Sequence, residues 1–544
     1  MGTSRDAWRG FRGEKWRDRI DVDGFIRDNV EPYAGDAAFL SGATGRTTRI
    51  WRHLQRMIVA ERERGIYDAD AHTPSTITSH APGWIDRDHE LIVGLQTSAP
   101  LRRAIMPAGG LRTVQAGLAA HGYSLDTTVR AIFTQYRKTH HDGVFDAYPA
   151  DVKAAADAHL LSGLSEVYGR GRVDGDYRRV ALYGVDRLIE ERTAQRTSLD
   201  SRRSFEDVVR GREELAEQIR ALEDLRFMAC RYGYDIAGPA TGAREAIQWL
   251  YFAFLGAAKE QDGATLPLGP VSAFVDIYLQ RDIAAGLLDE TAAQELLDDF
   301  VIKLRIIRFL DAPAPDLADA ELGGVVTRTS HRLAQSRRCF ASSSGVSPSG
   351  GCANLAKALL YAINGGRDEM TGDQVVSSLS PVEVDVLDYD TVLAAYDTML
   401  GRLAETYVDA LNVINYMHDR YAYERLGMAL RDHPLRRFMA TGIAGLSVAV
   451  DSLSAIRYAQ VKALRDSSGL VVDYQVDGDF PSVRDNDDRA DAIAVDLVDR
   501  FTAKIRRQPT YRGAELTLSI LTTGAPGGRH TGNTPDGRRA GEPL

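Results

Sequence analysis

The sequence is poor in cysteine and contains no long apolar run. Its 544 residues include three cysteines, Cys230, Cys339 and Cys352. Three thiols cannot build the disulfide framework of a small secreted domain, and such low usage is typical of a reducing compartment. No charge-free apolar stretch of about 18 residues occurs, which argues against a membrane-spanning helix. We therefore expect a cytoplasmic protein that does not insert into a membrane.

The chain also lacks a basic excess. Its 66 basic and 76 acidic residues give a net charge of −10, and no long basic run appears. Nucleic acid and anionic membranes are therefore not expected partners. The N-terminal residues are charged and carry no apolar core, so we do not expect a signal peptide. His-Glu-x-x-His, Cys-x-x-Cys and Gly-x-Ser-x-Gly patterns are missing, so neither a metal site nor a serine hydrolase is predicted.

Apolar periodicity predicts a helix-rich α/β protein. Steps of three and four residues indicate helices over 204–231 and about 390–420, and the second of these has a long apolar face. Residues 243–258 are apolar nearly all round, which predicts a buried helix. Alternating apolar residues predict strands over 472–476 and 516–520. No repeat of fixed period is found.

One segment departs from the composition of the rest. No Asp or Glu occurs between Leu322 and Arg367, although acids make up 76 of the 544 residues. The segment contains a basic run and a run rich in serine and glycine. Either it forms a surface loop, or part of the core that belongs there is missing.

An arginine-glycine motif over 168–184, YGRGRVDGDYRRVALYG, is the strongest local signal for ligand binding. Its glycines let the backbone turn tightly and approach a ligand, and a guanidinium matches a carboxylate with two hydrogen bonds. Arg172 is therefore a candidate for holding a small carboxylate substrate. A solvated turn is the alternative.

Two other features predict structure more than chemistry. Pro535-Asp536-Gly537 in the segment TGNTPDGRRAGEPL is typical of a surface turn. The neighbours His140 and His141 are unsuited to share a ligand, and His418 on the long helix is expected to make a structural hydrogen bond.

Several long collinear blocks together resemble pyruvate formate-lyase (formate C-acetyltransferase), a family of glycyl radical enzymes. The resemblance covers most of the chain outside 311–353. It favours the pyruvate enzymes over the diol-dehydratase relatives. The blocks that carry it are STITSHAPGWI (75–85), VGLQTSAPLRRAIMPAGG (93–110), YRKTHHDGVFDAYP (136–149), the 168–186 motif, RYGYDIAGPATGAREAIQW (231–249), NLAKALLYAINGG (354–366), NVINYMHDRYAYE (412–424), ATGIAGLSVAVDSLSAIRYAQVK (440–462) and TGNTPDGRRAG (531–541).

The resemblance implies a fold and a reaction. The family has a ten-stranded α/β barrel wrapped by helices and is usually a homodimer, so an incomplete version of this barrel is expected here. Pyruvate and coenzyme A give acetyl-CoA and formate during anaerobic fermentation. A separate S-adenosylmethionine-dependent activase places the radical on a glycine, and an adjacent pair of cysteines then carries the chemistry. No tightly bound cofactor is expected, and coenzyme A is a co-substrate.

The resemblance also assigns binding residues. Arg172 matches the first arginine that anchors the substrate carboxylate. Phe145 and Tyr168 match residues placed to contact coenzyme A. At the position of the second substrate arginine, this sequence has Cys352.

The catalytic cysteines of the family have no counterpart. The Cys-Cys positions appear as Ser344 and Gly345, and the radical-bearing glycine loop of the family would follow Leu544. We therefore expect three segments: a lyase-like region over 1–310, a degenerate segment over 311–353, and a second lyase region over 354–544, truncated before the radical domain.

Loss of these groups predicts an enzyme by descent that has no lyase activity by itself, since removing single catalytic groups commonly costs about 10³-fold or more. The alternatives are a non-catalytic fragment, a partner-binding relic, or a relative acting on 2-oxobutanoate. We also expect marginal stability, because strands without their neighbours leave open edges.

Overall fold

The computed structural model separates the chain into two compact units. The first comprises Met1–Thr139, Val173–Gly345 and Tyr421–Leu435, and the second comprises His140–Arg172, Val346–Arg420 and Arg436–Leu544. The residues that the structure describes are 7–32, 42–65, 67–106, 110–164, 166, 173, 175–199, 205–261, 268–310, 345–346, 351–432, 435–520 and 524–544.

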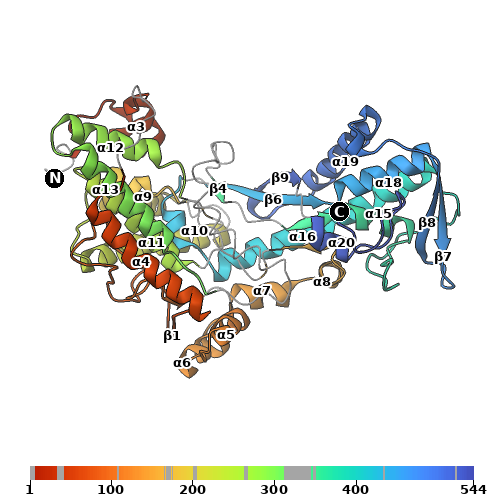
Figure 1. Ribbon diagram of the computed structural model, residues 1–544, viewed down its shortest axis with the longest axis horizontal. Helices are drawn as coiled ribbons and strands as arrows, with labels where there is room; N and C mark the ends of the chain where they lie inside the picture. Colours follow the sequence, from red (N-terminus) through yellow and green to blue (C-terminus); the bar gives the residue numbers. More distant parts are fainter. Residues whose placement is uncertain are drawn as a thin grey trace. The chain divides into compact units, whose positions relative to one another are not determined.

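The first unit is built mainly from helices (Figure 1). Its helices are α2 (Lys15–Asp18), α3 (Val22–Asn29), α4 (Gly45–Arg64), α5 (Leu111–Ala120), α6 (Thr127–Ala131), η1 (Ile132–Tyr136), α9 (Arg178–Ser198), α10 (Phe205–Arg231), α11 (Ala243–Glu260), α12 (Ser272–Ala284), α13 (Glu290–Arg305) and α17 (Arg425–Ala429). A parallel pair of strands, β1 (Ala69–Pro74) and β2 (Arg103–Ile105), completes it.

Helix α11 forms the centre of the core of the first unit. Its residues from Ala246 to Lys259 are all buried, as expected for a helix that is apolar on every side. Helices α9 and α10 pack against it. A kink at Gly184 interrupts α9, where φ is 75° and a Cβ would overlap the carbonyl of Ala237. Glycine is required there because the backbone both adopts positive φ and approaches a neighbouring chain segment.

The second unit combines a sheet with helices and a hairpin. Strand β5 (Cys352–Asn354) pairs antiparallel with β3 (Leu161–Ser162) and parallel with β6 (Arg436–Ala444), and β6 pairs parallel with β9 (Glu515–Ile520). Strands β7 (Gln460–Arg465) and β8 (Val471–Asp477) form an antiparallel hairpin. Strand β4 (Gly345–Val346) spans the boundary between the two units.

The helices of the second unit enclose a separate core. They are α7 (His140–Ala147), α8 (Ala150–Asp157), α15 (Leu355–Ile363), α16 (Tyr389–Tyr421), α18 (Leu446–Tyr458), η2 (Val483–Asp485), α19 (Asp488–Arg506), η3 (Tyr511–Gly513) and α20 (Gly524–Arg529). Every residue of α15 is buried, and the inner face of α16 packs into the same cluster. Helices α15, α16 and α18 lie beside the strands in Figure 1.

The structure confirms the helix-rich α/β class and the predicted elements. The expected helices correspond to α10, α11 and α16, and the expected strands to β8 and β9. One detail differs, because the register shifts near Val472 and leaves that side chain exposed while Tyr474 is buried. None of the helices in the described residues is long and apolar enough to cross a membrane. The expected segments 1–310, 311–353 and 354–544 stay a prediction.

Candidate active-site region

The described residues include some of the predicted site residues and leave out others. Arg172, Tyr168 and Ser344 lie outside the described residues. Gly345 is described as part of the two-residue strand β4. Phe145 and Cys352 are both described, and both belong to the second unit.

Phe145 presents an aromatic ring on helix α7. Its side chain is 38% exposed, and its ring packs edge-on against His141 at 4.7 Å and against Tyr148 at 5.8 Å. Tyr148 is buried, and burial together with nearby Glu166 raises its pKa. The two neighbouring rings therefore hold Phe145 in place while part of its ring faces solvent.

Cys352 is the first residue of strand β5 in the sheet of the second unit. Its Sγ lies 3.1 Å from Oγ of Ser162, its register partner on β3. Burial raises the pKa of the Cys352 thiol, although Ser162 lowers it in part. The thiolate is the nucleophilic form of cysteine, so this environment makes Cys352 a weakly reactive thiol.

Tyr407 connects the ends of β5 and β6 from helix α16. Its hydroxyl donates a hydrogen bond to the carbonyl of Gly351 and accepts one from the amide of Gly442 at 3.0 Å. Burial raises the pKa of Tyr407, so the phenol stays protonated and can serve as both donor and acceptor. Tyr407 thus holds the residue before Cys352 and the register partner of Cys352 on β6.

A buried lysine joins helix α15 to two carboxylates. The Lys357 ammonium lies 2.9 Å from Asp368 Oδ2 and 3.1 Å from Glu369 Oε1, and it donates to the carbonyl of His530 at 2.7 Å. Burial raises the pKa of Asp368, but hydrogen bonds from Lys357 and Tyr361 dominate and bring it to about 2. Burial raises the pKa of Glu369 despite its attraction to Lys357.

The segment TGNTPDGRRAG is packed against this charged cluster. Glu369 accepts a hydrogen bond from the amide of Gly532, and the side chain of Asn354 donates to Thr531 Oγ1 at 3.0 Å. Arg538 donates to the carbonyls of Gly532 and Gly528, each at 3.0 Å. The predicted turn is present at 535–537, where Gly537 is exposed, but the segment does not lie wholly on the surface, because Thr531, Thr534 and Arg538 are buried.

Two pairs of histidines contact each other in the described residues. His140 and His418 are both fully buried, with their ring centroids 5.6 Å apart in an edge-on contact. His159 instead stacks on His530 at 3.6 Å. Among the residues that the structure describes, no group of His, Cys, Asp and Glu is arranged to hold a metal ion.

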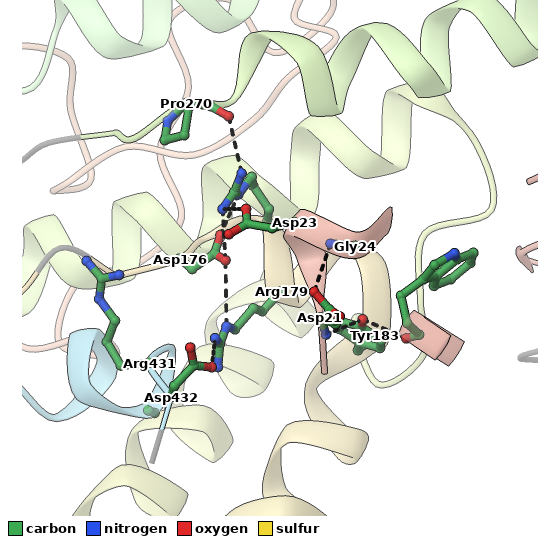
Figure 2. A network of polar contacts seen from close by, with 12 residues as sticks. Asp21, Asp23, Gly24, Asp176, Arg179, Tyr183, Pro270, Arg431 and Asp432 are labelled. Atoms are coloured by element: carbon green, nitrogen blue, oxygen red, sulfur yellow. Dashed lines mark hydrogen bonds and ion pairs between the residues drawn. The ribbon is translucent and has the colours of Figure 1, made fainter. Parts of the chain in front are cut away.

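The arginine-glycine motif contains a charged network in its second half, which belongs to the first unit. Arg178 holds Asp176 through two hydrogen bonds of 2.6 and 3.1 Å, and it also reaches Asp23 and the carbonyl of Pro270. Arg179 pairs with Asp176 and with Asp432. Figure 2 follows this network from Pro270 through Asp176 to Asp432.

Hydrogen bonds also connect Ala429 and Leu430 to this part of the first unit. The amide of Asp176 donates to the carbonyl of Leu430 at 3.1 Å, and Arg192 donates to the carbonyl of Ala429 at 3.0 Å. Burial raises the pKa of Asp176, but Arg178 and Arg179 hold it below its usual range. These arginines are therefore occupied within the protein. Their role was not predicted from the sequence, although Asp176, two residues before the adjacent Arg178 and Arg179, is a visible signal.

Three comparisons relate the chain to known proteins. Residues 13–327 and 336–527 match the family described as pyruvate formate lyase-like. A formate acetyltransferase from Haemophilus influenzae is 45% identical to the chain, over 99% of the chain and 82% of that relative.

Solved structures show the same fold. The structure reported for 1,2-propanediol dehydration in Roseburia inulinivorans matches with a TM-score of 0.70, at 15% identity, over 94% of this chain and 85% of that one. A glycyl radical enzyme from Archaeoglobus fulgidus matches with a TM-score of 0.62, at 16% identity, over 96% of this chain and 84% of that one.

Proposed function

The chain belongs to the pyruvate formate lyase-like family, and we propose that it has the function of a formate acetyltransferase, which converts pyruvate and coenzyme A to acetyl-CoA and formate. One observation carries this proposal: the 45% identity to a formate acetyltransferase extends over 99% of the chain. A partner-binding relic and a 2-oxobutanoate enzyme are not favoured, because the named relative is a formate acetyltransferase.

The described residues support a site for coenzyme A at Phe145. An aromatic ring that is 38% exposed and held by two neighbouring rings offers a surface on which a purine base can stack. We propose that Tyr168 completes this contact and that Arg172 anchors the carboxylate of pyruvate, as the resemblance implies.

The proposed reaction requires a reactive pair of cysteines. The family uses two adjacent cysteines, whereas Cys230, Cys339 and Cys352 are all separated in the sequence. Cys352 is a buried thiol with a raised pKa, which is unsuited to replace a reactive pair. The match to the relative extends over 630 residues, more than the 544 of this chain, which supports the loss of an internal segment. We therefore propose that the chain binds its substrates but does not complete acetyl transfer by itself.

The remaining partners follow from the family. An organic glycyl radical would supply the odd electron that breaks the carbon–carbon bond of pyruvate. We propose an S-adenosylmethionine-dependent activase and a second copy of the chain as its protein partners.

Binding of coenzyme A tests the function independently of turnover. We expect saturable binding by isothermal titration calorimetry, weakened at least about tenfold by Phe145→Ala, because stacking of a base on an aromatic ring contributes roughly 1–3 kcal/mol. Phe227→Ala is the matched control, since Phe227 is also an exposed phenylalanine and lies in the first unit. If coenzyme A does not bind, the proposed function is wrong.

An assay of turnover tests whether the chain completes acetyl transfer without an adjacent pair of cysteines. The protein is incubated without oxygen with activase, S-adenosylmethionine, pyruvate and coenzyme A, and acetyl-CoA is measured together with the electron paramagnetic resonance signal. We expect no acetyl-CoA. Its formation would support the acetyltransferase reaction and overturn the proposed loss of turnover.

A further inference from the structure

Two stacked imidazole rings connect parts of the second unit that are far apart in sequence. The ring centroids of His159 and His530 lie 3.6 Å apart with 20° between the ring planes, and both residues are half-buried. His159 lies in the turn between α8 and β3, whereas His530 directly follows α20. The stack is therefore a contact between the turn before β3 and the chain segment that follows α20.

The turn before β3 holds the His159 side of the stack in place. The backbone at His159 has a φ of 56°, which is uncommon for a residue other than glycine. The amide of His159 donates to the carbonyl of Ala156 at 3.0 Å, and the amide of Leu160 donates to the carbonyl of Ala155 at 2.9 Å. Hydrogen bonds therefore fix the turn at His159 and at the residue that follows it.

His530 lies where segment 531–541 is attached to α15. The Lys357 ammonium donates to the carbonyl of His530 at 2.7 Å, and Glu369 Oε1 accepts a hydrogen bond from the amide of Gly532 at 2.8 Å. Lys357 in turn pairs with Glu369 at 3.1 Å. Movement of His530 would therefore disturb the contacts that hold this segment.

Charged groups surround this attachment point. On the helices and segments that meet here they are Asp151, Lys153 and Asp157 of α8, Lys357 of α15, Asp368, Glu369, Arg529 of α20 and Arg538. Lys357 pairs with Asp368 at 2.9 Å as well as with Glu369. Arg538 donates to the carbonyl of Gly532 at 3.0 Å and adds a second buried cation. Two cations are thus already in contact with the segment that begins after His530.

Acid changes the charges at this point in one direction. An imidazole ordinarily takes up a proton between about pH 5 and 8, and two protonated rings this close repel each other. Burial raises the pKa of Glu369, so this carboxyl takes up a proton at a higher pH than an exposed one would, and protonation removes its attraction for Lys357. Acidification therefore adds positive charge to the stack and removes a negative charge beside Lys357.

We propose that the stack of His159 and His530 is a pH switch: it holds segment 531–541 in place while no more than one ring is protonated, and it releases the segment when both rings are protonated. This proposal does not rest on the acetyltransferase function. Release would also remove the hydrogen bond from Asn354 to Thr531 Oγ1, and Asn354 is the last residue of β5. A change at the two rings would therefore reach strand β5.

Hydrogen exchange followed by mass spectrometry tests the switch in the full chain. Protection factors, which correct for the intrinsic effect of pH on exchange, are compared at pH 7.5 and pH 5.5 for peptides that cover 531–541. We expect protection in the wild type to fall at least about tenfold at the lower pH, because repulsion between two close charges opens the contact. Peptides from the middle of α16 are the internal reference and should keep their protection.

Two variants remove the charge in different ways. His530→Phe keeps an aromatic ring that can stack but that cannot be protonated, so we expect the fall to shrink to less than about threefold. His159→Asn removes the stacking ring and suits a positive φ, so we expect low protection at both pH values. His53→Phe is the matched control, since His53 lies on α4 in the first unit, and it should behave as the wild type.

The outcomes separate the stack from other causes. No fall in the wild type, or a fall of the same size in His530→Phe, would overturn the proposal. If His530→Phe does not fold, a fall in His159→Asn as large as in the wild type would overturn it equally. A fall that is lost in Glu369→Gln but kept in His530→Phe would assign the effect to that carboxyl in place of the two rings.

Discussion

The Lys357 ammonium lies within 3.1 Å of both Asp368 and Glu369, so one buried cation serves two buried carboxylates. The three charges also hold the segment after α20, through the carbonyl of His530 and the amide of Gly532. Charged groups this deeply buried are tolerated when each is paired. This cluster is therefore a point at which the packing of the second unit depends on electrostatics.

Replacing Lys357 by methionine tests that dependence. We expect the Lys357→Met variant to lose about 3–5 kcal/mol of unfolding free energy, because two buried carboxylates would remain without a cation. Urea denaturation monitored by circular dichroism measures the change. Lys462→Met, at an exposed position of β7, is the control and should change the unfolding free energy by less than about 0.5 kcal/mol. Equal stability of the two variants would contradict the assigned role.

The lowered pKa of Lys259 predicts that the free energy of unfolding depends on pH in the alkaline range. Burial, with a contribution from Arg231, lowers its pKa to about 8 from 10.5. Between these values the unfolded chain binds one proton more than the folded chain, so this residue makes stability rise with pH across that window. Below pH 8 the buried charge costs about 3 kcal/mol.

Comparison with Lys259→Met isolates this effect, because other titrating groups are common to both proteins. We expect the variant to be stabilised relative to the wild type by about 2 kcal/mol more at pH 7 than at pH 10. Urea unfolding at the two pH values measures it. A difference in unfolding free energy that does not change with pH would show that Lys259 keeps its ordinary pKa.

The network around Asp176 predicts a large effect from a small change. Asp176→Asn removes one negative charge and leaves Arg178 and Arg179 buried, so we expect a loss of about 3–5 kcal/mol in unfolding free energy. Asp186→Asn is the matched control, because Asp186 forms an exposed ion pair with Arg226. Such exposed pairs contribute less than about 1 kcal/mol. Thermal denaturation of both variants measures the change in stability. If Asp176→Asn loses no more than Asp186→Asn, the network does not stabilise the fold.

The two described cysteines should differ in reactivity. Cys352 is buried with a raised pKa, whereas Cys230 is exposed on α10. With iodoacetamide at pH 8 we expect Cys352 in the native protein to react at least about tenfold more slowly than Cys230, because alkylation needs an accessible thiolate. Peptide mass spectrometry follows each thiol separately. Similar rates in urea but not in buffer would confirm that the fold causes the difference.

Much of the fold could be predicted where a pattern extends over many residues. Helix α11 is apolar on every side and α16 carries a long apolar face, so periodicity identified both. Strands β3 and β5 have two and three residues, which is too short for any alternation to appear in the sequence. Long-range pairing determines them instead.

The site was harder to predict because its partners are far apart in sequence. Turn residues in TGNTPDGRRAG correctly indicate a turn, but burial there depends on Arg538 bonding to carbonyls and on Glu369, more than 160 residues away. Lys357 offered one signal, since it is a lysine within an otherwise apolar helix, and such a residue requires a buried counter-charge. Its two acidic partners were not evident from the sequence alone.

The charged network in the second half of the arginine-glycine motif changes how strongly this stretch attracts an anion. Arg178 and Arg179 form ion pairs with Asp176 and with acids from other segments. This stretch, in which Arg178 and Arg179 each face a carboxylate, is therefore close to neutral at short range. Counting arginines overstates its attraction for anions, and discrimination among ligands must come from shape and hydrogen-bond direction.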